Sequence, residues 1–209
     1  MIAVINIGVG NIKSVLMALK RVAPSEKVEI VSTNRKLDEA HKIIFPGQGS
    51  MTNCFFRIKK LGLLNSLKKN IQEKPFFGIC LGKQFLFEYS EEGQSEGLGL
   101  ISGEVKKFNK DKVNNIKIPH MGWNKINLKK KHQVFDGFSE LTEDELYFYF
   151  VHSFFVVPKD KNIIVAESEH GIRFPSVIAK ENVIATQFHP EKSAHLGLRV
   201  LKNFVSWNP

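Results

Sequence analysis

Cysteine is scarce in this sequence, with only Cys54 and Cys80 among 209 residues. A small secreted protein held together by disulfides would need more, so we exclude a disulfide framework. The longest apolar run, residues 147–157, is shorter than the ~20 residues of a membrane-spanning helix and has His152 and Ser153 in its middle. The first residues lack the basic start and small-residue cleavage site of a signal peptide. We therefore expect a cytoplasmic protein with no membrane partner.

Arginine contributes little to the positive charge of the chain. Lys and Arg number 30 against 21 Asp and Glu, a net charge of +9, yet only five of the basic residues are arginines. Proteins that read nucleic acids favour arginine, whose planar guanidinium makes paired hydrogen bonds to phosphates and base edges. The densest basic run, residues 129–132, has no aromatic residues among its charges. We interpret the excess as solvated surface charge and expect no nucleic-acid partner.

The residues that are present are typical of an ordinary globular chain, with 43% hydrophobic and 24% charged side chains. The length favours a single domain over residues 1–209. In the first half, short apolar runs alternate with amphipathic stretches, which predicts parallel strands joined by helices. The expected strands are residues 2–7, 28–31, 43–45 and 75–79, and the expected helices are residues 12–22, about 54–72 and 81–89.

After residue 95 the pattern changes to glycines and short alternating runs, which predict further strands, several of them antiparallel. A last helix is expected at about 194–207. We therefore predict an α/β fold, doubly wound, with a mainly parallel central sheet, helices on both faces and antiparallel additions in the second half. The later strand segments are residues 97–108, 116–128, 146–157, 163–168 and 177–188.

The segment Gly78-Ile79-Cys80-Leu81-Gly82 has the form G-x-C-x-G at a predicted strand-to-helix junction. This is the nucleophile-elbow pattern with cysteine in place of serine. The flanking glycines are expected to allow a sharp turn, and the following helix N-terminus is expected to favour the thiolate. A small buried cysteine at a strand end is the alternative reading. Cys54, among Phe55, Phe56 and Ile58, has no such context and is expected in the core.

A thiolate nucleophile needs a base that is oriented by a third group. Of the seven histidines, His189 has the most suitable setting, because Pro190 ends the preceding strand and the carboxylate of Glu191 follows. We predict that His189 lies at the same carboxyl edge of the sheet as Cys80, with Glu191 holding its tautomer. A surface loop is the alternative for this tripeptide alone.

A third element is the turn Pro46-Gly47-Gln48-Gly49, which follows another predicted parallel strand. Open α/β sheets bind ligands at this carboxyl edge, and glycines let backbone N–H groups point at a developing oxyanion. The turn lacks the lysine of a phosphate-binding loop. The segment 8–13 has Lys13 where a dinucleotide fingerprint requires its third glycine, so nucleotide binding is not indicated.

Together the segments FPGQGS, GICLGKQ and QFHPEKS resemble the class I, triad-type glutamine amidotransferases, a flavodoxin-like fold, over nearly the whole chain. The finer match is to the glutaminase subunits of imidazole glycerol phosphate synthase. It rests on GVGN near the start and on GLGLISGEV, IPHMGWN, YFVHSF and GIRFPS at residues 97–105, 118–124, 149–154 and 171–176. The combination of PHMGWN with YFVHSF is more specific than the triad.

The resemblance implies roles for individual residues. Cys80 would be the nucleophile, His189 the general base and acid, and Glu191 the orienting carboxylate. Oxyanion and substrate binding would fall to Gly47, Gln48, Gly49, Leu81, Gln84, His152 and Ser153. The synthase interface would include Asn11, His120, Trp123 and Lys192, although the bulk of Trp123 could serve packing alone.

The resemblance also implies a reaction and its partners. L-Glutamine would be hydrolysed to glutamate through a cysteinyl thioester, with no metal or organic cofactor. The ammonia would pass to a (β/α)₈-barrel cyclase subunit of a heterodimer in histidine biosynthesis.

The sequence departs from this family in three places, none of which touches the triad. Lys83 stands where Met is usual, Asn6-Ile7 replaces a common Asp-Tyr, and Phe154 replaces a tyrosine. These departures leave open a paralogous glutaminase that supplies ammonia for amidino-sugar synthesis on a bacterial surface glycan. More distant alternatives are a stand-alone cysteine peptidase or γ-glutamyl hydrolase, and a basic module that binds nucleic acid.

Overall fold

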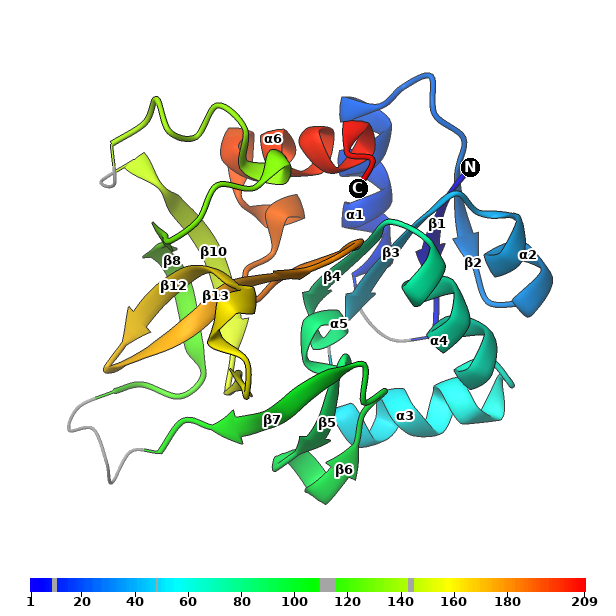
Figure 1. Cartoon of the computed structure of the whole chain (residues 1–209), viewed down its shortest axis with the longest axis horizontal. Coiled ribbons are helices and arrows are strands. Elements are labelled where there is room, and N and C mark those ends of the chain that lie inside the picture. Colours follow the sequence, from blue (N-terminus) through cyan, green and yellow to red (C-terminus); the bar gives the residue numbers. More distant parts are fainter. Residues whose placement is uncertain (9–10, 48, 110–115, 143–144) are drawn as a thin grey trace.

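The computed structural model describes residues 1–8, 11–47, 49–109, 116–142 and 145–209 (Figure 1). Its largest sheet has eight strands in the order β2-β1-β3-β4-β14-β13-β12-β9, and the first five of these run parallel. The strands of this sheet are β1 (Ile2–Ile5), β2 (Val28–Val31), β3 (Lys42–Gly47), β4 (Phe76–Cys80), β9 (Asn127–Leu128), β12 (Ile164–His170), β13 (Ile172–Lys180) and β14 (Val183–Thr186).

Helices cover both faces of the parallel half, and side-chain alternation along the strands explains why. On β1, Ile2 and Val4 join one apolar core, whereas Ala3 and Ile5 join the other. Strands that are buried on both faces need helices on both sides. The first core packs against α1 (Ile12–Val22) and α6 (Ala194–Ser206), and the second against α2 (Asn34–Glu39), α3 (Met51–Lys60) and α4 (Leu64–Glu73).

The second half of the chain extends the sheet with antiparallel strands and adds two smaller sheets. β13 pairs antiparallel with both β12 and β14. The smaller sheets have the strand orders β10-β8 and β11-β7-β5-β6. Their strands are β5 (Phe87–Ser90), β6 (Ser95–Glu96), β7 (Ile101–Lys107), β8 (His120–Lys125), β10 (Tyr147–His152) and β11 (Phe154–Pro158). The predicted fold class, a mainly parallel α/β sheet with antiparallel additions, is confirmed.

Several element boundaries differ from the prediction. The helix expected at 54–72 is two helices, α3 and α4, because the chain turns at Gly62 with φ +66°. The helix expected at 81–89 stops at Gln84 as α5 (Leu81–Gln84), and the next residues form β5, which pairs with β7 and β6. Helix α2 was not predicted.

Three segments that were predicted as strands hold two strands each. The segment 116–128 contains β8 and β9, which belong to different sheets. The segment 146–157 divides at Ser153 into β10 and β11, which belong to different sheets. The segment 177–188 contains a hairpin between β13 and β14, with Glu181 at φ 51° in its turn. None of the helices in the described ranges has the length and apolar character needed to cross a membrane.

Candidate active site

Three segments that are far apart in the sequence meet at the carboxyl edge of the parallel sheet. β3 ends at Gly47 and β4 ends at Cys80, and these two residues are paired in register. β14 lies on the other side of β4, and its continuation leads to His189. The structure therefore brings together the three elements that the sequence motifs placed at this edge.

Cys80 itself makes the sharp turn at the end of β4. Its backbone has φ 53° and ψ −103°, a conformation that non-glycine residues rarely adopt and that clusters at functional sites. The flanking glycines were expected to supply the turn, but close packing is what requires them. A Cβ at Gly82 would collide with the carbonyl oxygen of Phe45, and one at Gly78 would lie 2.8 Å from the carbonyl oxygen of Gly82.

The helix that follows the turn is short, because α5 comprises only Leu81–Gln84. A single helical turn carries a much smaller dipole than a long helix, since the aligned peptide dipoles add along the axis. The expected support of the thiolate by this helix N-terminus is therefore weaker than the sequence suggested.

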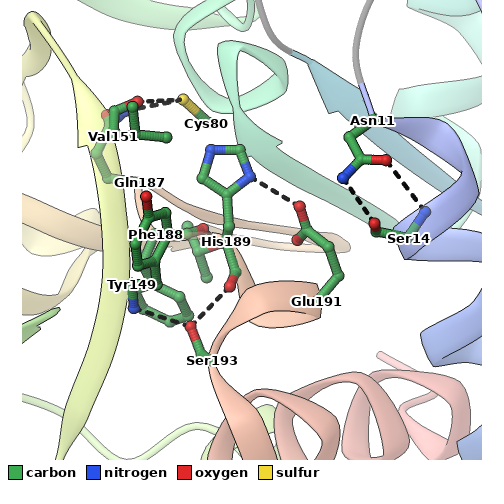
Figure 2. A network of polar contacts seen from close by, with 11 residues as sticks. Asn11, Ser14, Cys80, Tyr149, Val151, Gln187, Phe188, His189, Glu191 and Ser193 are labelled. Carbon is green, nitrogen blue, oxygen red and sulfur yellow. Dashed lines mark hydrogen bonds and ion pairs between the residues drawn. The ribbon is translucent and has the colours of Figure 1, made fainter. Parts of the chain in front are cut away.

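His189 is held by hydrogen bonds to both its ring and its backbone. Its ring Nδ1 lies 2.8 Å from Glu191 Oε1, and both side chains are 2% exposed. Its backbone N–H donates to the Tyr149 carbonyl at 2.9 Å, and its carbonyl accepts from Ser193 Oγ at 2.6 Å. Ser193 Oγ in turn accepts from the Tyr149 N–H at 3.0 Å, so β10 fixes the histidine from two directions (Figure 2).

The second ring nitrogen of His189, Nε2, is buried and has no hydrogen-bond partner among the described residues. It lies on the side of the ring nearer to Cys80 (Figure 2). Burial lowers the pKa of His189, but Cys80 and Glu191 favour the imidazolium and together raise the pKa to about 10. The arrangement can hold an imidazolium beside the Cys80 sulfur.

The Cys80 thiol is 7% exposed and faces two groups across the site. Its Sγ lies 3.9 Å from the carbonyl oxygen of Val151 and accepts from Gln187 Nε2 at 3.6 Å. Gln187 was not identified from the sequence, although it stands two residues before His189. Cys54, in contrast, is fully buried in α3, and burial raises the pKa of its thiol.

The predicted oxyanion elements surround the thiol. Gly47 touches the elbow so closely that a Cβ there would lie 2.6 Å from the Leu81 Cβ. Gly49 has φ +110°, and a Cβ there would meet open space. Gln48 lies outside the described residues.

A pocket opens next to Cys80 and contains five of the predicted oxyanion and substrate residues. Gln84, one of them, donates its side-chain amide to the Phe154 carbonyl at 3.1 Å. Glu92 is a pocket residue that sequence reasoning missed; it accepts from the Met51 N–H at 2.8 Å, and burial raises the pKa of its carboxyl group. The signal for Glu92 in the sequence was the pair of adjacent acidic residues, Glu91 and Glu92, in a chain with a net positive charge. The lining residues are Gly49, Cys80, Leu81, Gln84, Glu92, Pro119, Tyr149, Val151, His152, Ser153, Phe154 and Lys192.

His152 lines this pocket, but both of its ring nitrogens are already engaged. Nδ1 lies 2.7 Å from the Phe154 carbonyl oxygen, and Nε2 lies 2.9 Å from His120 Nδ1. His120 also approaches Asn124 and stacks on His170 with ring centroids 4.2 Å apart. Among the described residues, no group of three or more His, Cys, Asp or Glu side chains is arranged to hold a metal ion.

The four residues predicted at a partner interface have different environments. The Trp123 side chain is 54% exposed on β8, and Lys192 lies over the Tyr149 ring at 5.7 Å on the wall of the pocket. Asn11 caps α1, because its Oδ1 accepts from the Ser14 N–H at 3.4 Å, and its Nδ2 also donates to Ser14 Oγ at 2.6 Å. The His120 side chain is only 5% exposed, so its contribution to a binding surface would be indirect.

Comparisons with known proteins agree with this geometry. A family model described as "Glutamine amidotransferase class-I" matches residues 3–207. The chain is 44% identical to the imidazole glycerol phosphate synthase subunit HisH of Aromatoleum aromaticum, covering 100% of this chain and 99% of that one. It is 40% identical to the protein of the same name from Neisseria meningitidis serogroup A, with 98% and 99% covered.

Solved structures resemble the chain in fold at low sequence identity. The structure of PurLQS from Thermotoga maritima matches with a TM-score of 0.71 and 19% identity, covering 98% of this chain and 97% of that one. The glutaminase domain of Trypanosoma brucei CTPS with bound acivicin matches with a TM-score of 0.63 and 15% identity, covering 100% and 94%. These likenesses bear on the fold alone.

Proposed function

The chain belongs to the class I glutamine amidotransferases, and from this premise we propose that Cys80, His189 and Glu191 hydrolyse glutamine to glutamate and ammonia. The chain is a glutaminase, and it serves as the glutaminase subunit of imidazole glycerol phosphate synthase in histidine biosynthesis. Full-length relatives of that name, 40% and 44% identical, support this assignment over amidino-sugar synthesis. Its free thiols suit the reducing cytoplasm, where we place it.

The observation that carries the proposal is the environment of His189. Glu191 holds one ring nitrogen at 2.8 Å, while the other is buried, without a partner in the described structure, on the side nearer to Cys80. A base that is oriented by a carboxylate and free on its nucleophile side is the arrangement that cysteine-dependent acyl transfer requires.

The reaction follows from the positions of these groups. The Cys80 thiolate attacks the side-chain amide carbon of glutamine, and the His189 imidazolium donates its proton to the departing nitrogen. Ammonia leaves and a γ-glutamyl thioester remains. His189, now neutral, takes a proton from water, which attacks the thioester and releases glutamate. Glu191 keeps the imidazole in the tautomer that both steps require and stabilises its protonated form.

The pocket offers groups that match the two ends of glutamine. We assign the Glu92 carboxylate to the substrate α-ammonium, because it is the only carboxylate among the described residues that line the pocket. The N–H groups near Gly49 and Leu81 would face the oxyanion that forms on the amide carbon, since both residues border the thiol. Gln84 and Ser153 complete the polar lining around the substrate.

Ammonia must reach its acceptor without entering water, where it would be protonated and lost. We propose that a (β/α)₈-barrel cyclase subunit docks over the mouth of the pocket. Two large apolar side chains on β8, Met121 and Trp123, are 63% and 54% exposed there. Pro119, just before β8, and Lys192 line the pocket itself. A partner on this surface would cover the pocket and confine its product.

The experiment that tests the proposed chemistry separates hydrolysis from synthesis. Cys80→Ala should abolish glutamine-dependent formation of imidazole glycerol phosphate by the complex, yet leave ammonia-dependent formation unchanged, because only hydrolysis needs the thiol. Cys54→Ala is the matched control; it should keep both activities and lower the free energy of unfolding by about 1 kcal/mol. Full glutamine-dependent activity in Cys80→Ala would refute the assignment.

Docking has its own test in Lys192, which is half-buried between the pocket and the Tyr149 ring. Lys192→Ala should weaken the stimulation of glutaminase activity by the cyclase about tenfold, because one charged contact at an interface is worth roughly 1–2 kcal/mol. Lys202→Ala, an exposed lysine on α6, is the control. If the cyclase stimulates the wild type and Lys192→Ala equally, Lys192 does not contribute to the interface.

A further inference from the structure

Lys83 occupies the position where the related glutaminases usually carry methionine, and its side chain is completely buried beneath the active site. It belongs to α5, three residues after Cys80. Its Nζ donates to the carbonyl oxygen of Pro175 on β13 and lies 3.5 Å from Gln187 Oε1. Lysine is rarely buried to this extent unless its charge is compensated.

No carboxylate forms an ion pair with Lys83 within the described ranges of the chain. The titratable groups that interact electrostatically with Lys83 are Cys80 at the end of β4 and His152 at the end of β10. Burial lowers the pKa of Lys83 to about 7, and the charge of Cys80 opposes that shift. His152 is held neutral, because burial lowers its pKa well below the ordinary value. The Cys80 thiolate is therefore the anion available to balance a Lys83 ammonium.

Gln187 connects the two groups and is itself fully buried. Its Oε1 faces the Lys83 amine, and its Nε2 donates to Cys80 Sγ at 3.6 Å. An ammonium group can only donate hydrogen bonds, so a charged Lys83 forces the amide oxygen towards itself and the amide N–H towards the sulfur. A neighbouring methionine would exert no such control over the amide.

We propose that Lys83 is a positioning residue that orients the Gln187 amide and, through it, stabilises the Cys80 thiolate. The inference rests on the proposed function of Cys80 as nucleophile. Lys83 would also compensate for the short α5. A one-turn helix places little positive charge near the thiol, and the lysine adds positive charge behind it. The stabilisation acts while Lys83 is protonated and fades as pH rises through about 7, where the lysine becomes neutral.

The test is the pH dependence of Cys80 alkylation by iodoacetamide, measured by mass spectrometry at each cysteine in the full chain. Lys83→Met restores the usual family residue, so it should fold. We expect the midpoint of the alkylation profile to rise by about one pH unit, which corresponds to about tenfold slower alkylation below the midpoint. The acidic limb of the kcat/KM profile for glutamine, measured in the complex, should move in the same direction.

Lys42→Met is the matched control, because Lys42 is also buried and also donates to a carbonyl oxygen, that of Trp207, but lies at the opposite end of β3. It should leave the alkylation profile of Cys80 unchanged. An unchanged profile in Lys83→Met would overturn the proposal. Alkylation reports the thiolate even if the chain does not hydrolyse glutamine, so failure of the proposed function remains distinguishable.

Gln187→Leu tests the relay independently, since it removes the amide and leaves the lysine. We expect a shift in the same direction as for Lys83→Met. The double variant should shift little more than the larger single variant, because both substitutions break one path. Fully additive shifts would overturn the relay through Gln187.

Discussion

Buried histidines that contact or belong to the strand β10 behave in opposite ways. His189, whose backbone bonds to Tyr149, is 1% exposed, and the pKa of its ring is raised to about 10. His120 and His152 are each 5% exposed; burial lowers the pKa of His120 to about 4 and the pKa of His152 well below 6.5. The three histidines are therefore buried to a similar extent, and the neighbouring groups decide whether the pKa is raised or lowered.

The difference lies in the charges that each ring faces. Burial lowers the pKa of all three rings, but His189 has Cys80 and the Glu191 carboxylate beside it, and these favour the protonated form. His120 and His152 face each other and His170, and repulsion among them adds to the effect of burial. The fold thus favours a proton on His189, beside Cys80, and disfavours one on His120 and His152.

The largest effect on activity is expected from the substitution of His189. His189→Gln should lower the kcat of glutamine hydrolysis by about 10²–10⁴-fold, because the protein loses the group that we propose as general acid and base. His195→Gln, an exposed histidine on α6, is the control and should stay within about twofold of the wild type. Comparable losses in the two variants would mean that the environment of His189 has no special role.

A smaller loss is expected when the charge next to His189 is removed and the hydrogen bond is retained. Glu191→Gln should lower turnover by about 10²-fold, less than His189→Gln, because the amide oxygen can still orient the ring. The pKa of His189 should fall, so the alkaline limb of the activity profile should move to lower pH.

The sign of the accompanying stability change follows from the raised pKa of His189. Protonation of His189 stabilises the folded state fully below pH 6.5, and this stabilisation is lost as pH rises through about 10. Glu191→Gln should therefore narrow the stability gap between the variant and the wild type on going from pH 7 to pH 10.5. A gap that widens with pH would contradict the assigned direction.

His120 and His152 predict the opposite pH response and the smallest effect. Their pKa values are lower in the folded than in the unfolded chain, so stability should fall as pH drops from 6.5 towards 4, where the unfolded chain takes up protons first. For His120 the loss should be on the order of 2 kcal/mol. Urea unfolding at several pH values measures it, and His120→Asn should flatten the slope in this range.

The sequence motifs predicted the centre of the site because its parts are local. The elbow at Cys80 and the pair His189 and Glu191 are each contained in a few adjacent residues, and strand ends place both at one edge. Lys83 meets Gln187, and Glu92 meets the pocket, only through packing between distant elements, so these environments could not be predicted. The sequence shows that Lys83 departs from the family pattern, but it does not show that Lys83 is buried.

The same distinction explains the fold. The parallel half was predicted well because the apolar runs of β1, β3 and β4 are strands that are buried on both faces. The helix expected at 81–89 was wrong because Phe87–Ser90 pairs with β7, a partner that follows later in the chain. Ser153, which separates β10 from β11, carries no turn signature strong enough to predict two strands in different sheets.

The central claim is that His189 is an imidazolium beside Cys80 while the neighbouring histidines are neutral. Two-dimensional ¹H–¹⁵N NMR of ¹⁵N-histidine-labelled protein from pH 4.5 to 10.5, with resonances assigned through His189→Gln and His152→Gln, observes both groups in one experiment. The account predicts that His189 is protonated on both nitrogens at pH 8 and titrates near 10, while the pKa of His152 lies well below 6.5. A His189 ring that is neutral at pH 8 and titrates near 6.5 would contradict it.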